Sequence, residues 1–158
     1  MWIRSLGMSE CLRVLAENRL GHLACANDGM PYVVPIHYAY ADDYIYGFSL
    51  PGKKIDILRA NPQASLQVEK QGPGRQWQSA IVEGRFEELP DRIGHKRERD
   101  HAWTLLSRYS DWWQPGGVKP IPASSGDLGE VFFRIGIERV SGREAKEEMP
   151  PDKVLIAK

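Results

Sequence analysis

Short runs of β-branched and aromatic residues, separated by turn residues, dominate the first third of the chain. They occupy residues 21–26, 32–40 and 44–48. Such side chains favour strands, whereas Asn27-Asp28-Gly29 and Asp42-Asp43 tolerate the positive φ values of tight hairpin turns. We therefore predict three consecutive antiparallel strands over this stretch.

The same kind of pattern predicts three later strands. Apolar and polar residues alternate over residues 63–69, 77–86 and 130–140, which is the period-two pattern of strands with one buried face. After Arg143 the chain is charged and contains proline, so we expect a frayed tail there.

Three segments show helical spacing instead. A first helix is predicted over residues 9–18, with Ser9 as a candidate N-cap. A second is predicted over residues 53–60, because Asn61-Pro62 directly after it would end a helix. Residues 91–108 form a longer amphipathic pattern. The buried face predicted for the first helix consists of Leu12, Leu15 and Ala16.

The segment 110–129 has no period and is rich in proline and glycine. A loop of this length inside a compact domain is usually functional or lies at an interface. Trp112 and Trp113 strengthen that interpretation, because their large apolar surfaces need to be covered.

Composition narrows the class of protein. A chain of 158 residues with 42% hydrophobic and 27% charged residues is typical of one globular domain. Lys plus Arg equals Asp plus Glu at 21 each, so no overall field attracts nucleic acid or a membrane. Cys11 and Cys25 lack metal or redox spacing, and no leader or spanning segment is evident, so we expect a reducing, cytoplasmic location.

A basic cluster follows the third strand and opens the helix predicted over residues 53–60. Lys53 and Lys54 stand at the end of the helix where the macrodipole favours anions, after Ser49 and Gly52. Two interpretations stay open: a phosphate binds at this helix end, or the lysines are simply solvated.

Pro35 lies within the second predicted strand and cannot donate a ladder hydrogen bond. It should therefore lie at an edge or a bulge, where regular pairing opens. An open backbone beside a cavity could bind a planar ligand.

Six or so antiparallel strands with three flanking helices predict an α+β domain built on a small barrel. Four runs carry a resemblance to a known family: RLGHLACANDGMPYVVPIHYAY, YIYGFSLPGKKIDILRANPQASLQV, WQSAIVEGRFEEL and FFRIGIERVSGREA. In order and spacing they resemble the pyridoxamine 5'-phosphate oxidase-related FMN-binding split-barrel proteins, and particularly the nitroimidazole-resistance-like branch. The expected domain spans residues 1–145, followed by a tail over 146–158.

The resemblance implies a homodimer that holds two FMN molecules at its interface. The residues implied for the isoalloxazine ring are Val34, Pro35, Ile36 and His37. Those implied for the ribityl chain are Tyr46, Gly47, Phe48 and Ser49. Those implied for the phosphate are Ser49, Lys53, Lys54, Trp77 and Ser79. The helix around His101 and the Trp112-Trp113 loop would lie near the partner's flavin.

The C-terminal segment limits the resemblance, and the histidines leave their roles open. Authentic pyridoxamine phosphate oxidases end in an arginine-rich segment, whereas this chain ends in EAKEEMPPDKVLIAK, so we do not expect vitamin B6 oxidation. His37 is either a residue beside the flavin or a hydrogen-bonded core histidine. His22, His95 and His101 lack metal-ligand spacing, so no metal site is predicted.

The sequence is compatible with two classes of function. The first is an FMN-dependent oxidoreductase acting on a small molecule, in which the cofactor carries the hydride or electrons. The second is a flavin-binding or carrier protein without turnover, or a split barrel that uses deazaflavin or haem. No catalytic residue can be assigned from the sequence.

Overall fold

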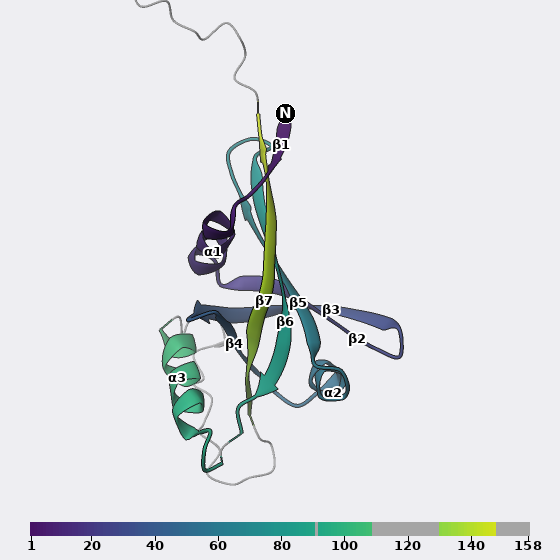
Figure 1. The fold of residues 1–158 in the computed structure, drawn as a ribbon, viewed down its shortest axis with the longest axis vertical. Helices are drawn as coiled ribbons and strands as arrows, with labels where there is room; N and C mark the ends of the chain where they lie inside the picture. Colours follow the sequence, from purple (N-terminus) through teal and green to yellow (C-terminus); the bar gives the residue numbers. More distant parts are fainter. Residues whose placement is uncertain (91, 109–129, 148–158) are drawn as a thin grey trace, which may run out of the picture.

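The chain folds into a mostly antiparallel sheet that curls into a barrel, with three helices packed around it (Figure 1). The computed structural model describes residues 1–90, 92–108 and 130–147. Its strands are β1 (Trp2–Ser5), β2 (Leu20–Asn27), β3 (Met30–Ala41), β4 (Tyr44–Ser49), β5 (Gln63–Gln71), β6 (Trp77–Glu88) and β7 (Val131–Lys146). Its helices are α1 (Met8–Glu17), α2 (Lys53–Ala60) and α3 (Lys96–Ser107). Across these ranges, no helix is long and apolar enough to cross a membrane.

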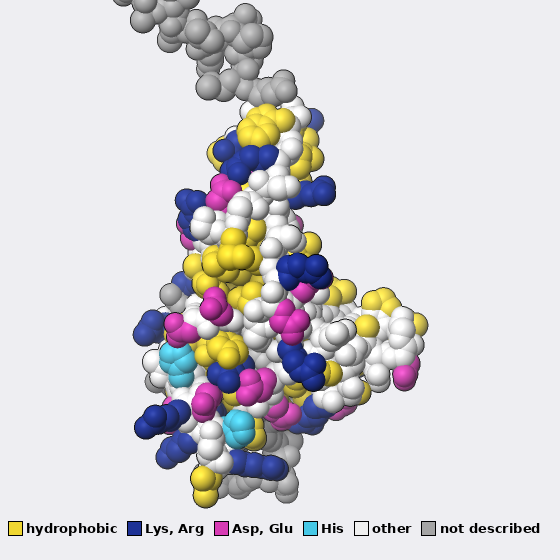
Figure 2. Space-filling model, viewed as in Figure 1, with side chains coloured by type: hydrophobic (Ala, Val, Ile, Leu, Met, Phe, Trp, Pro, Cys, Tyr) yellow, Lys and Arg dark blue, Asp and Glu magenta, His cyan; other side chains and the backbone are white. Residues whose placement is uncertain are grey.

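The strand order is β1-β7-β4-β3-β2-β5-β6, and β6 also pairs with β7. That last pairing closes six strands into a ring and leaves β1 attached to the outside of β7. The predicted α+β class and the small split barrel are therefore confirmed. Positively and negatively charged side chains are interspersed on the face shown in Figure 2, in keeping with the balanced composition.

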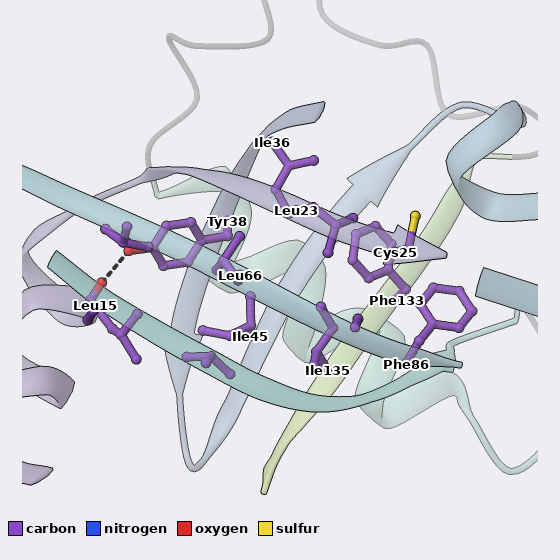
Figure 3. Packing of buried hydrophobic residues seen from close by; sticks show 14 of the residues in the cluster. Leu15, Leu23, Cys25, Ile36, Tyr38, Ile45, Leu66, Phe86, Phe133 and Ile135 are labelled. Atoms are coloured by element: carbon purple, nitrogen blue, oxygen red, sulfur yellow. Dashed lines mark hydrogen bonds between the residues drawn. The ribbon is translucent and has the colours of Figure 1, made fainter. Parts of the chain in front are cut away.

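The interior of the barrel is filled by side chains from every strand of the ring (Figure 3). At one end α1 adds Val14 and Leu15, and the buried hydroxyl of Tyr38 donates a 2.7 Å hydrogen bond to the Leu15 carbonyl oxygen. At the other side α2 adds Ile55 and Leu58, as its sequence spacing predicts. The barrel is thus a packed core with no room inside for a large cofactor.

A second, smaller cluster lies outside the barrel. The buried face of α3 packs there against side chains of β3, β4 and β7. Its buried members are Ala39, Tyr46, Leu89, Ala102, Leu105, Leu106 and Phe132. The predicted helix over residues 91–108 is therefore confirmed in type, but it starts at Lys96. The 110–129 loop, with Trp112 and Trp113, lies outside the described residues.

Both ends of the chain differ from the sequence-based prediction. No strand was predicted where β1 lies, and fraying was predicted after Arg143, yet β7 continues to Lys146 and Ala145 is fully buried. The physical reason is Arg4 of β1, whose guanidinium pairs with Glu10 at 2.7 Å and with Glu144 at 2.7 Å.

Glu144 itself is buried, and burial opposes its ionisation. Hydrogen bonds from Gln78 and Lys146 and the charge of Arg4 nevertheless hold its pKa below the ordinary value. A carboxylate that looks like part of a polar tail is therefore stable within the sheet, because charged donors surround it.

The start of α1 also differs from the prediction. Gly7, not Ser9, is the N-cap, and its N–H donates to the Glu10 carboxylate at 2.8 Å. The buried face is made by Cys11, Val14 and Leu15, whereas Ala16 is exposed. Both thiols, Cys11 and Cys25, are free and buried.

Gly47 provides a test of this packing. A Cβ atom there would overlap the ring of Phe133, which is fully buried and cannot move aside. We expect Gly47→Ala to lower the free energy of unfolding by about 1–3 kcal/mol in urea denaturation. Gly136→Ala is the matched control, because its Cβ would meet only Tyr44 at an ordinary 3.5 Å. Equal stability of the two variants would contradict this packing.

Candidate functional site

The barrel opens along one edge of β3. This strand pairs with β2 from Met30 to His37, but its pairing with β4 starts only at Tyr38. Over the described residues, the other edge of β3 from Met30 to His37 therefore has no strand partner. Pro35 lies within this stretch, as predicted for a residue that cannot donate to a ladder. An unpaired strand edge can present backbone N–H and C=O groups to a ligand.

The four residues predicted to lie along a flavin ring occupy this stretch of β3. Ile36 is buried in the core and Val34 is half-buried, whereas Pro35 is exposed. His37 is half-buried, and burial lowers the pKa of its imidazole below the ordinary value. At neutral pH this histidine is therefore mainly uncharged.

The basic pair lies at the first turn of α2, beside the β2–β3 hairpin. The ammonium of Lys53 lies 4.8 Å from the centre of the Tyr32 ring. Lys54 is half-buried, and its burial lowers the pKa of the ammonium, while interaction with Cys25 opposes that shift. Tyr32 and Cys25 are cross-strand partners, so both lysines adjoin the same part of the hairpin.

The electrostatics of this turn favour an anion. Among the described residues, no carboxylate forms an ion pair with Lys53 or Lys54. The positive end of the helix dipole adds to their charge. A phosphate group would relieve this repulsion, because it brings negative charge and several hydrogen-bond acceptors.

Ser49 closes β4 just before this turn. It is buried, and its hydroxyl donates a 2.7 Å hydrogen bond to the carbonyl oxygen of Leu50. The hydroxyl therefore stabilises the turn in this structure. It would have to leave that acceptor before it could donate to a phosphate.

The side chains of the preceding β4 residues pack inside the protein. Tyr46 lies beneath α3, where the His101 ring meets it edge-on at 5.5 Å. Gly47 faces the Phe133 ring, and Phe48 lies 5.2 Å from the ring of Phe132. Any contact of Tyr46 or Gly47 with a ligand at the open edge would therefore have to come from the backbone.

Trp77 and Ser79 lie apart from the other predicted site residues. They belong to β6, which is separated from β3 by β2 and β5 in one direction and by β4 and β7 in the other. Ser79 accepts a 3.2 Å hydrogen bond from the side chain of Gln67. A single chain does not bring these two residues to the basic pair.

Two residues near the lysines, Tyr32 and Cys25, were not among the predicted site residues. The cation–π contact of Tyr32 and the electrostatic interaction of Cys25 depend on the packing of α2 against β2. Periodicity assigns the strand faces of both residues, but it does not show which helix covers them.

Comparison with known proteins places this arrangement in a family. The family model described as pyridoxamine 5'-phosphate oxidase matches residues 8–144, which is most of the chain. The chain belongs to the pyridoxamine 5'-phosphate oxidase family. An uncharacterized protein of Rhizobium meliloti is 44% identical over 146 residues, covering 92% of this chain and 97% of that protein.

Solved structures of known proteins also resemble this chain. A crystal structure of an FAD-binding protein from Mesorhizobium loti is 55% identical, with a TM-score of 0.77, and the match covers 93% of this chain and 99% of that one. A putative 5-nitroimidazole antibiotic resistance protein from Bacteroides thetaiotaomicron is 18% identical with a TM-score of 0.67, covering 91% of this chain and 89% of that one. The second similarity shows a shared fold only.

Proposed function

We propose that this protein binds a flavin nucleotide and uses it as an oxidoreductase acting on a small molecule. The observation that carries the proposal is the basic first turn of α2, without carboxylate partners among the described residues, beside the open edge of β3. A flavin nucleotide has matching parts: an anionic phosphate and a planar ring with hydrogen-bonding edges. The 55% identical protein named as FAD-binding supports the same ligand class.

In this proposal, different residues of the chain bind the phosphate and the ring of the flavin. Lys53 and Lys54 neutralise the phosphate, and the backbone from Val34 to His37 meets the edge of the ring. The neutral imidazole of His37 avoids an extra buried charge beside the ring. The bound flavin would supply hydride or electron transfer, whereas the protein supplies position and electrostatics.

The resemblance of the sequence favours FMN, whereas the name of the 55% identical relative favours FAD. Both contain riboflavin 5'-phosphate, so the basic pair serves either cofactor in the same way. Chromatography of the cofactor released on denaturation distinguishes them.

A homodimer follows from the same proposal. The barrel interior is filled by side chains, so a flavin at the edge of β3 needs a cover from outside. A second subunit is the economical cover, and it could bring Trp77 and Ser79 to the phosphate that they cannot reach within one chain.

The first prediction concerns the colour of the protein. We expect the purified protein to be yellow, with flavin absorbance bands that shift on denaturation, and to oxidise NAD(P)H when a nitroaromatic acceptor is present. A colourless protein that does not bind added FMN or FAD in a fluorescence titration would overturn the proposed function. Binding without turnover would leave a flavin carrier, and a Soret band would indicate haem.

The second prediction concerns the basic pair. The double variant Lys53→Ala, Lys54→Ala should weaken FMN binding at least 100-fold, because each charge-assisted contact contributes roughly 1.5–3 kcal/mol. Riboflavin, which lacks the phosphate, should bind almost as it does to the wild type. Lys96→Ala, Arg97→Ala is a matched control, since that exposed basic pair opens α3. Equal losses of FMN and riboflavin affinity would indicate a collapsed pocket instead.

The same titration has an expected pH dependence. Because burial lowers the pKa of Lys54, its ammonium loses its proton at a lower pH than an exposed lysine does. FMN affinity in the wild type should therefore start to fall, as pH rises, before an exposed lysine would titrate. Riboflavin affinity should not follow this change.

The fourth prediction concerns assembly. Light scattering should show a dimer, and Trp112→Ala, Trp113→Ala should weaken it if the loop carrying both residues lies at the interface, as the sequence predicts. A wild-type monomer that binds flavin tightly would refute the dimer. A dimeric double variant with unchanged flavin fluorescence would refute only the assignment of the loop.

A further inference from the structure

The backbone groups that face the open edge of β3 can be identified from the strand register. The N–H of Tyr38 donates a 2.9 Å hydrogen bond to the carbonyl oxygen of Arg19, so the backbone polar groups of Tyr38 point toward β2. From there to the tip of the hairpin, β2 and β3 pair in a constant register. Because successive residues of a strand point their N–H and C=O groups to opposite sides, every second residue before Tyr38 also points toward β2.

The residues between them point their backbone groups to the open side. These outward residues are Pro31, Val33, Pro35 and His37. Two of them are prolines and have no N–H to donate. The residues that point toward β2 include no proline; they are Met30, Tyr32, Val34, Ile36 and Tyr38. Both prolines of β3 therefore lie at outward positions, where they leave the pairing with β2 intact.

Apart from these prolines, the edge is suited to the addition of another strand. It runs from Met30 to His37, and the side chains of Pro31, Val33 and Pro35 are exposed. Among the described residues, no backbone hydrogen bond joins Val33 to another element on this side. Figure 1 shows the hairpin of β2 and β3 extending away from the rest of the sheet. A long, exposed apolar edge of this kind is a site at which other strands pair and proteins aggregate.

The prolines remove the hydrogen bonds that such a strand needs. An antiparallel strand exchanges two hydrogen bonds with each outward residue of the edge that it joins. Opposite Pro31 and Pro35, a carbonyl oxygen of the added strand would meet a pyrrolidine ring instead of a donor. Because the prolines alternate with Val33 and His37, no two neighbouring outward residues of this edge both carry an N–H.

A small planar molecule does not depend on a regular ladder. It forms only a few hydrogen bonds, and the carbonyl oxygens of all four outward residues remain as acceptors. The edge therefore discriminates by the length of the repeating contact that its occupant needs.

We propose that Pro31 and Pro35 are specificity-determining residues, which exclude a β-strand from the open edge of β3 and leave that edge to a small planar ligand. The exclusion of strands is argued from the register of β3 alone. The identity of the ligand as a flavin rests on the proposed function.

The exclusion is tested with two matched variants of the protein after removal of any flavin. Pro31→Ala, Pro35→Ala restores both N–H groups, so light scattering should detect species larger than the wild-type assembly at a roughly tenfold lower protein concentration. Pro31→Lys, Pro35→Lys restores the same groups but adds two charges that oppose edge pairing, and it should keep the wild-type assembly. Equal association of the two variants, or association of neither, would overturn the inference.

The register is tested by amide hydrogen exchange in the flavin-free wild type. The N–H groups of Val34 and Ile36 face β2, whereas that of Val33 faces the open side. The Val33 amide should therefore exchange at least roughly tenfold faster than those two. Equal protection of the three amides would show that the edge is already paired and would overturn the inference.

Addition of flavin separates this inference from the proposed function. If the wild type binds flavin, saturating flavin should return the alanine variant to the wild-type assembly, because the ligand occupies the edge. Association that flavin does not reverse would refute the assignment of the ligand to this edge. If the wild type binds no flavin, the proposed function fails, while the two matched variants and the exchange rates still decide whether the prolines exclude a strand.

Discussion

The structure depends on β7 being a shared partner for three other strands. Its first residues pair with all of β4, its last residues pair with β1, and almost its whole length pairs with β6. A β-bulge between Glu83 and Gly84 bends this long pairing, and Gly84 permits it because a Cβ there would overlap the backbone of Gly136. β4 pairs with β7 from Tyr44 to Ser49, but with β3 only as far as Gly47. The end of β4 therefore follows β7 away from β3, and this divergence opens the edge at which the candidate site lies.

Local sequence patterns predicted most of the elements. The bounds of α2 were predicted to the residue, because Ile55 and Leu58 set its buried face and Asn61-Pro62 ends it. The errors came where distant residues decide the structure. β1 is short, and the end of β7 looks like a charged tail until Arg4 is placed beside Glu144. An ion pair between residues 140 positions apart has no local pattern in the sequence.

In the candidate site too, local patterns predicted some residues, whereas the positions of others depend on distant elements. Lys53, Lys54 and Pro35 could be predicted, because a cation at a helix N-terminus and a proline within a strand are each exceptions to a local rule. The positions of Tyr46, Trp77 and Ser79 could not, because they depend on where α3 packs and on how many strands lie between β3 and β6.

The first turn of α2 shows how a candidate binding site can lower the stability of the fold. Burial of Lys54 disfavours its charged form, the helix dipole opposes it, and among the described residues no carboxylate forms an ion pair with it. The pKa of Lys54 is lower in the folded chain than in the unfolded chain, so between these two pKa values the unfolded chain binds more protons. The loss of folding stability from the charged Lys54 is therefore fully present at neutral pH and fades as pH rises. An anion bound only by the folded state removes that penalty and adds its own stabilisation through mass action. Under the proposed function, the helix terminus would therefore be least stable when empty, and occupancy would be linked to the stability of the neighbouring barrel edge.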